Sequence, residues 1–313
     1  MKKVFIDGKD GTTGLKIFKR FENRNDIELL LIDSDKRKDA EERARLINES
    51  DITFLCLPDA ASIEAVSLVE NSNTKIIDTS TAHRTLSDWA YGFAELSREH
   101  REKIESSNRI AVPGCYASGF NSIVYPLVHN GFIDKDYDIV CYALSGYTGA
   151  GKKGIAQYED SSRDAELDSP RLYALTQEHK HLKEMKAISG LSKKPIFSPI
   201  ICDYPQGMVV SVPLYTDRMS KKYTIQDIYE MFAEHYGNSD IVKVRRPGYT
   251  QSMIGSNQFA NRDDMEIEIN GNEDRILITS RFDNLGKGAS GAAIQCMNIA
   301  MGIDEKTGLN IGE

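Results

Sequence analysis

The first 115 residues alternate short apolar runs with longer stretches whose apolar side chains recur at helical spacing. Strands are predicted over residues 4–6, 27–32, 52–57 and 75–77. Helices are predicted over residues 40–48 and 60–70, and after the first strand through Leu15, Ile17, Phe18 and Phe21. The run 52–57 is continuously apolar, which is typical of a strand buried on both faces. This rhythm predicts a parallel sheet covered by helices on both sides.

After Cys115 the pattern changes to successive strands with occasional helices. Strands are predicted over residues 138–144, 196–201, 207–215, 265–269 and 275–282. The last two flank the sequence NGNED at residues 270–274, a strong hairpin signal. Residues 224–236 predict a helix capped by Thr224. We therefore expect an α+β domain on a mixed or antiparallel sheet, followed by a closely packed helix in the small-residue stretch 286–302.

Length and composition add bounds to this picture. A chain of 313 residues favours two domains, and 40% hydrophobic with 27% charged residues is typical of a globular protein. A net charge of −8 argues against a nucleic-acid surface. No apolar run approaches the roughly 20 residues that a membrane helix needs. The N-terminus enters a strand at once, which leaves no room for a signal peptide and predicts a cytoplasmic protein.

Five widely spaced cysteines argue against a disulfide framework and against a structural zinc site. Such thiols stay free in a reducing compartment, where a catalytic thiolate is chemically possible. We expect no bound metal.

A glycine loop lies between the first predicted strand and the first predicted helix. Gly8, Gly11 and Gly14 frame Thr12 and Thr13 in a G-x-x-G-x-x-G spacing rather than the usual dinucleotide fingerprint. Glycines permit a tight turn and close backbone approach, while free N–H groups at a helix start can receive a pyrophosphate. A plain turn is the alternative, but the placement favours a nucleotide.

The end of the second predicted strand bears on the choice of cofactor. Asp33 stands where an acid would favour NAD, yet Ser34, Lys36 and Arg37 follow it closely. A serine with several cations suits the 2′-phosphate of NADP. The alternative is a solvated charged turn.

Cys115 follows a Pro-Gly pair and precedes an apolar helical stretch, so it falls at or just before a helix N-terminus. The partial positive charge there favours the thiolate, the form that attacks carbonyl carbon. The other four cysteines lie in strand or helix patterns and fit the buried, inert interpretation better.

A catalytic thiol needs a proton acceptor, and His179 and His181 stand just before a short helical segment. A metal interpretation of this H-x-H pair lacks further ligands. The remaining histidines, which are His83, His100, His129 and His235, are interpreted as ordinary surface groups.

Together these segments resemble the short form of N-acetyl-γ-glutamyl-phosphate reductase, an NADP-dependent enzyme family of arginine biosynthesis. The resemblance runs through residues 8–14 (GKDGTTG), 54–58 (FLCLP), 77–84 (IDTSTAHR), 112–119 (VPGCYASG), 145–153 (SGYTGAGKK), 179–181 (HKH) and 283–298 (DNLGKGASGAAIQCMN). The cysteine segment and the last segment are quite specific, whereas the glycine loop is shared with relatives such as aspartate-semialdehyde dehydrogenase.

The resemblance implies an α/β fold of two domains. Residues 1–114 would form an NADP-binding Rossmann-like domain, with a C-terminal helix in residues 285–313 packing back on it beside the cofactor. Residues 115–284 would form an α+β catalytic domain related to that of glyceraldehyde-phosphate dehydrogenase. The family also forms homo-oligomers, so a dimer or tetramer is expected.

The resemblance also implies roles for single residues. Cys115 would be the nucleophile, His179 the base, and His181 the second choice for that role. Arg84, with Ser145 and Lys152 as weaker candidates, would hold the acyl phosphate. Pro58, Asn284 and Gly286 would approach the cofactor. Without the resemblance, Arg84 would be interpreted as a surface cation and residues 145–154 as a flexible loop.

The expected reaction is NADPH-dependent reduction of N-acetyl-glutamyl 5-phosphate to the 5-semialdehyde through a thioester on Cys115. Aspartate-semialdehyde dehydrogenase is one alternative, although that family usually has Asn where this chain has Gly114. A non-catalytic NADP-binding sensor is the other alternative.

Overall fold

The computed structural model describes residues 1–248 and 252–312, and these divide into two compact units. The first unit joins Met1–Gly114 with Ala289–Leu309, and the second joins Cys115–Gly288 with the last residues from Asn310 onward. No helix in the described ranges is long and apolar enough to cross a membrane.

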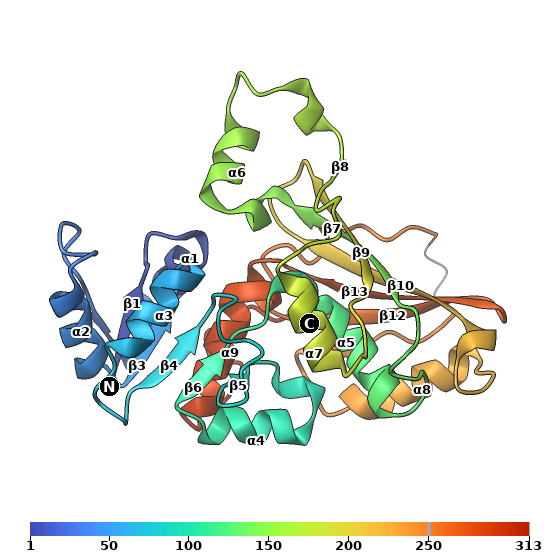
Figure 1. Ribbon diagram of the computed structural model, residues 1–313, viewed down its shortest axis with the longest axis horizontal. Coiled ribbons are helices and arrows are strands. Elements are labelled where there is room, and N and C mark those ends of the chain that lie inside the picture. The colour runs from blue at the N-terminus through green and yellow to red at the C-terminus, as the bar shows by residue number, and fades with distance from the viewer. Residues whose placement is uncertain (249–251, 313) are drawn as a thin grey trace. The chain divides into compact units, whose positions relative to one another are not determined.

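The first unit is built on a parallel sheet of six strands in the order β2-β1-β3-β4-β6-β5 (Figure 1). Its strands are β1 (Lys2–Asp7), β2 (Ile27–Leu30), β3 (Ile52–Leu55), β4 (Lys75–Asp78), β5 (Ala90–Tyr91) and β6 (Arg109–Ala111). Its helices include α1 (Thr12–Phe21), α2 (Ala40–Glu49), α3 (Asp59–Ser67), α4 (Arg98–Ser106) and α9 (Gly291–Ala300). The parallel sheet is confirmed, and β3 is buried along its whole length as predicted.

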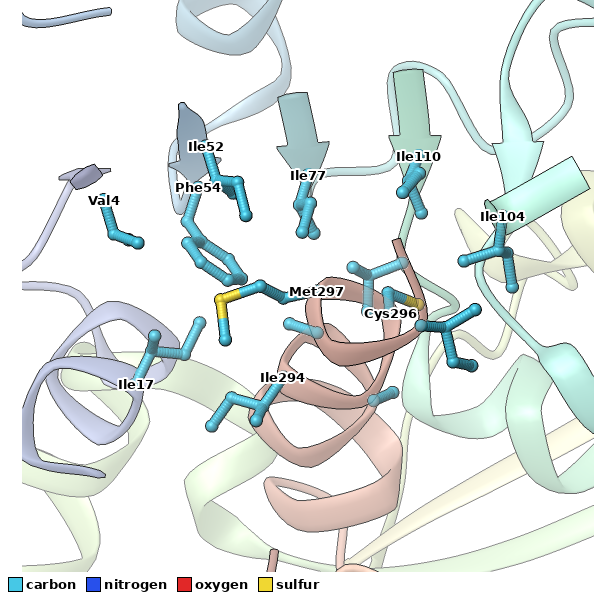
Figure 2. Packing of buried hydrophobic residues seen from close by; sticks show 14 of the residues in the cluster. Val4, Ile17, Ile52, Phe54, Ile77, Ile104, Ile110, Ile294, Cys296 and Met297 are labelled. Atoms are coloured by element: carbon cyan, nitrogen blue, oxygen red, sulfur yellow. The ribbon is translucent and has the colours of Figure 1, made fainter. Parts of the chain in front are cut away.

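Apolar side chains on the two faces of this sheet enter two different cores because successive strand residues point in opposite directions. Phe5 packs with Leu46 of α2 and Ala65 of α3. On the other face, Val4 shares a core with Met297 of α9. Figure 2 shows this second core, with Ile294 and Met297 of α9 beneath Phe54, Ile77 and Ile110 of the sheet. The small residues Ala292 and Ala293 are buried in the same core.

The second unit is built on a mixed sheet of seven strands in the order β11-β12-β13-β10-β7-β9-β8. Its strands are β7 (Val140–Gly146), β8 (Arg171–Leu172), β9 (Ile196–Cys202), β10 (Met208–Tyr215), β11 (Val242–Val244), β12 (Met265–Gly271) and β13 (Arg275–Phe282). The β7–β9 and β11–β12 pairs are parallel and the others antiparallel, so the mixed sheet and the β12–β13 hairpin are confirmed.

The helices of this second unit include α5 (Cys115–His129), α7 (His181–Ser189) and α8 (Ile225–Tyr236). α5 packs on β10 and β13, and α7 packs on α5. Thr224 caps α8 as predicted, in a reciprocal capping box with Asp227.

Residues 145–154 are regular structure, so their interpretation as a flexible loop is wrong. They comprise the end of β7, a 3₁₀ turn over Tyr147–Ala150, and the start of α6 (Gly151–Glu159). Figure 1 shows α6 and β8 in a lobe that leaves the end of β7. Tyr147, Tyr158 and Leu167 form a small core of their own there, with the two tyrosine rings stacked 4.7 Å apart. This local core orders a segment whose glycines alone suggested mobility.

Candidate active site

Cys115 is the first residue of α5, which confirms its predicted place at a helix start. The thiol is half-buried, and the helix dipole favours its ionised form. The remaining cysteines are also free, and three of them are poor nucleophiles because burial raises the pKa of Cys56 to about 12 and raises the pKa values of Cys141 and Cys202. Compared with Cys56, Cys141 and Cys202, Cys115 is therefore the better candidate for a nucleophile.

The structure brings both predicted histidines to the residue that follows Cys115. The ring of Tyr116 lies 5.8 Å from His179 and 5.9 Å from His181, measured between centroids. The two histidine rings are 4.8 Å apart, and Phe197 of β9 lies 5.2 Å from both Tyr116 and His179. α5, α7 and β9 thus place an aromatic cluster beside the thiol.

His179 is held in a defined protonation state. Burial, and then the cation of Lys180, lower the pKa of His179 to about 4, so the ring is neutral at pH 7. Its Nδ1 accepts a hydrogen bond of 3.1 Å from the backbone N–H of His181. A neutral imidazole with Nδ1 as acceptor carries its proton on Nε2. That Nε2 lies 3.5 Å from the hydroxyl of Tyr173. In this arrangement His179 is a donor through Nε2–H.

Hydroxyl groups extend this cluster to Ser145. Tyr116 forms hydrogen bonds with both Tyr173 and Ser145, and burial raises the pKa of each tyrosine. The buried Ser145 hydroxyl also donates to the carbonyl of Gly146 at 3.1 Å. Ser145, a predicted phosphate ligand, therefore belongs to the same group as the two histidines. Tyr116 and Tyr173 were not predicted, although Tyr116 stands next to Cys115 in the sequence. We call this group, which is Tyr116, Ser145, Tyr173, His179 and His181, the thiol cluster.

The other two predicted phosphate ligands have different surroundings. Lys152 is exposed in the first turn of α6. Arg84 is buried in the first unit, so its interpretation as a surface cation is wrong. Its guanidinium donates to the backbone carbonyls of Val112 at 2.8 Å and Thr79 at 2.9 Å. Arg84 thus ties the segment that leads toward Cys115 to the end of β4.

His83 is also buried, so its interpretation as an ordinary surface group is wrong. Its Nδ1 lies 2.6 Å from a carboxylate oxygen of Asp78, and its ring stacks on Trp89 at 4.1 Å. Asp78 ends β4 and is fully buried, so it needs such partners, and the turn after the strand supplies them. The polar residues around His83 in the sequence did not predict that it pairs with Asp78.

The glycine loop of the first unit fits a dinucleotide. Gly8 has a φ of +88°, and a side chain there would overlap the carbonyl oxygen of Cys56. A side-chain carbon at Gly14 would lie 2.5 Å from the carbonyl oxygen of Gly8. α1 begins at Thr12 with no side chain capping it, and Thr13 follows in its first turn. The first amides of α1 are therefore suited to a pyrophosphate.

The remaining cofactor candidates of the first unit follow neighbouring parallel strands, so they share one edge of the sheet. Ser34, Lys36 and Arg37 are exposed in the turn after β2, and Arg37 pairs with Asp10 of the glycine loop at 3.1 Å. Pro58 is the N-cap of α3, just past β3. We call the glycine loop and the turn after β2 the cofactor edge.

Asn284 and Gly286 lie in the second unit and have packing roles of their own. The buried Asn284 amide accepts from the N–H of Gly207 and donates to the hydroxyl of Thr148, both at 3.0 Å. A side chain at Gly286 would overlap the carbonyl oxygen of Arg262. Within residues 1–248 and 252–312, no three His, Cys, Asp or Glu side chains group together as a metal site would require.

Comparisons with known proteins show the family to which the chain belongs. The family model for the semialdehyde dehydrogenase NAD binding domain matches residues 3–104, and that for the semialdehyde dehydrogenase dimerisation domain matches residues 115–284. An N-acetyl-gamma-glutamyl-phosphate reductase of Brucella ovis is 43% identical over 306 residues, covering 96% of this chain and 99% of the relative. The Sinorhizobium fredii protein of that name is 43% identical over 303 residues, covering 96% and 98%.

Solved structures support the fold. Aspartate semialdehyde dehydrogenase II from Vibrio cholerae has a TM-score of 0.73 at 15% identity, covering 96% of this chain and 98% of that one. The aspartate semialdehyde dehydrogenase of Francisella tularensis has a TM-score of 0.71 at 14% identity, covering 96% and 100%. At these identities the likeness shows the fold alone, which is a Rossmann-like domain with an α+β domain of the kind found in glyceraldehyde-phosphate dehydrogenase.

Proposed function

The chain belongs to the N-acetyl-gamma-glutamyl-phosphate reductase family, and on that premise we propose that it is an oxidoreductase of arginine biosynthesis. It reduces N-acetyl-glutamyl 5-phosphate to N-acetyl-glutamate 5-semialdehyde and releases phosphate. The observation that carries this proposal is the placement of Cys115 at the start of α5, beside a cluster that contains two histidines.

Cys115 acts as the nucleophile. Its thiolate attacks the acyl phosphate, the carbon–oxygen bond to phosphate breaks, and the acyl group stays on sulfur as a thioester. A bound NADPH supplies hydride chemistry that converts this acyl group to the aldehyde level. Cys115 then leaves as a thiolate, ready for another substrate.

His179 and His181 are the candidates for transferring protons to and from Cys115 and the substrate, and His179 is the first choice. As arranged, neutral His179 donates through Nε2–H, which suits protonation of the oxygen that develops on the substrate. To take the thiol proton at Nε2, the ring must first carry its own proton on Nδ1, and it then gives up the hydrogen bond from His181. Accepting the thiol proton and protonating the substrate oxygen therefore need different tautomers of His179, or His181 performs one of these two proton transfers.

NADP is the cofactor that we propose, rather than NAD. Ser34, Lys36 and Arg37 of the cofactor edge offer a hydroxyl and two cations to a 2′-phosphate. The glycine loop beside them would hold the pyrophosphate, and Pro58, Asn284 and Gly286 remain candidates for the rest of the cofactor. Ser145, Lys152 and Arg84 remain candidates for the acyl phosphate.

We also propose that the protein forms a homo-oligomer through the second unit, in the cytoplasm, where its five cysteines stay reduced. The paired residues Val140 and Ile196 are 39% and 59% exposed on the sheet, an apolar pair that a second copy could cover. The dimerisation-domain model matches this same unit. Light scattering should show a dimer or larger species, and Ile196→Lys should shift it toward monomer; a monomeric wild type would contradict this part of the proposal.

The activity is tested by Cys115→Ala in the reverse direction, as phosphate-dependent oxidation of N-acetyl-glutamate semialdehyde with NADP. Turnover should be abolished, whereas Cys141→Ala, which removes a buried thiol of β7, should leave it near the wild-type value. Aspartate semialdehyde serves as the comparison substrate. Near-normal turnover by Cys115→Ala, or a preference for aspartate semialdehyde, would overturn the assignment.

A further inference from the structure

Gly288 lies directly against the nucleophile. A side-chain carbon at position 288 would be 2.9 Å from Cβ of Cys115, 3.0 Å from the carbonyl oxygen of Asp283 and 3.3 Å from the ring of Phe282. Carbon atoms in contact prefer about 3.5–4.0 Å, so even a methyl group does not fit beside Cys115. The bare Cα of Gly288 therefore forms part of the surface on which Cys115 rests.

Gly288 belongs to a π-helical turn, Gly286–Ser290, that Asp283 holds in place. Asp283 is fully buried, and one of its carboxylate oxygens accepts from the N–H groups of Leu285 at 2.6 Å and Gly286 at 3.1 Å. Its backbone carbonyl accepts from the N–H of Gly288 at 2.9 Å. Hydrogen bonds accepted by this one residue thus shape the turn up to Gly288.

The other carboxylate oxygen of Asp283 fixes the turn to the rest of the second unit. It accepts from the side-chain amide of Gln206 at 2.7 Å and from the backbone N–H of Asn261. With both oxygens occupied and no exposure to solvent, the carboxylate cannot shift without leaving buried donors unpaired. Movement of the turn away from Cys115 would therefore break these hydrogen bonds.

Packing also opposes movement of α5 away from the turn. Gly119, one helical turn after Cys115, lies so close to the sheet that a side-chain carbon there would be 2.5 Å from Val210 and 2.8 Å from Phe282. The helix is thus in tight contact with β10 and β13 on one side. Cys115 is the first residue of this helix, and its Cβ lies against the Gly288 turn, so it has little freedom to move.

We infer that Gly288 and Asp283 are positioning residues, which fix the Cys115 side chain at the start of α5 in its reactive orientation. Neither residue needs to touch the substrate for this role. The inference rests on the proposed function only in taking Cys115 as the nucleophile.

Gly288→Ala tests the inference through the reactivity of the thiol. Iodoacetamide reacts with the thiolate, and a displaced sulfur loses part of the helix N-terminal charge that favours this form, so we expect alkylation of Cys115 at pH 7 to slow by about ten-fold. Its pH midpoint should rise, because the sulfur moves from the helix N-terminus. The kcat should fall while the KM for NADPH stays within about two-fold of wild type. Alkylation needs no substrate, so its outcome is separate from that of the proposed function.

Gly237→Ala is the matched control. It also adds a methyl group against the backbone, 2.6 Å from the carbonyl oxygen of Ala233, but this methyl group would contact neither Cys115 nor Asp283. Asp283→Asn is the second variant, because its amide would face the donors of Gln206 and Asn261. We expect slower alkylation here as well. The inference is overturned if folded Gly288→Ala or Asp283→Asn alkylates at the wild-type rate and pH midpoint, or if Gly237→Ala slows it equally.

A double-mutant cycle tests the contact between Gly288 and Cys115 through thermal stability. Replacing Cys115 by glycine removes the Cβ against which the new methyl group presses, so Gly288→Ala should lower Tm less in Cys115→Gly than in wild type. Equal losses of Tm in both backgrounds would mean that Gly288 and Cys115 do not press on one another, and would also overturn the inference.

Discussion

The cofactor edge of the first unit and the thiol cluster of the second present their candidate groups by different means. At the cofactor edge the proposed binding groups are backbone amides and exposed side chains such as Lys36 and Arg37. In the thiol cluster the candidate groups are side chains held by mutual contacts, such as His179 against Tyr116 and Tyr173. Under the proposed function, the first arrangement would mainly set how tightly a cofactor binds, and the second how fast bound substrate reacts. Changes at the edge should therefore act on KM, and changes in the cluster on kcat.

The largest effect is expected from His179→Asn. Loss of a positioned acid or base costs about 10²- to 10⁴-fold, and it should appear in kcat while the KM for NADPH stays nearly constant. Steady-state kinetics with N-acetyl-glutamyl phosphate measures both. His129→Asn, at the exposed end of α5, is the control. An effect of His179→Asn on KM alone would break the division between the two regions.

Gly8→Ala should show the opposite signature. The residue would be strained at a φ of +88° and would overlap Cys56, so the loop must change shape. We expect the KM for NADPH to rise by about ten-fold or more, with alkylation of Cys115 within about two-fold of wild type. If thiol reactivity fell together with cofactor binding, the two regions would not be independent.

Arg37→Ala should have a smaller effect, confined to one cofactor. Loss of an exposed cation should raise the KM for NADPH by about three- to five-fold and leave that for NADH unchanged, because exposed ion pairs are worth about 1 kcal/mol or less. Asp10→Asn frees Arg37 from its pair and should lower the KM for NADPH. Equal responses with both cofactors would argue that this turn does not contact a 2′-phosphate.

The smallest effect concerns stability against pH. The pKa of His179 is lowered in the folded protein, so unfolded chains bind a proton that folded ones do not as the pH falls from about 6.5 to about 4. Wild type should lose free energy of unfolding across this window, and His179→Gln should lose less. The ring is partly exposed, so the difference should stay below about 1 kcal/mol. Denaturant titrations at several pH values measure it, and parallel curves would contradict the lowered pKa.

Much of the fold could be predicted because its strands are continuous apolar runs, as with β3, or alternate apolar and polar residues in sequence, as with β12. β5 and β6 were not predicted because two or three residues carry too little pattern. α4 was missed because it is almost entirely polar, with Ile104 as its buried residue.

The candidate site divides in the same way. Cys115 at a helix start was predictable, since Pro113 and Gly114 mark the boundary locally. The contacts of Tyr116 with Tyr173 and of Gly288 with Cys115 join residues far apart in sequence, and only the packing of α5 brings them together. Burial of His83 likewise depends on a partner, Asp78, that the turn after β4 supplies.

Under the proposed function, Cys115 carries the acyl group as a thioester. Mass spectrometry of the protein incubated with N-acetyl-glutamyl phosphate and no NADPH can detect this intermediate. We expect an N-acetyl-glutamyl adduct on the peptide that contains Cys115, released by hydroxylamine and absent from Cys115→Ala. An adduct on another residue, or none in a preparation that turns over with NADPH, would contradict it.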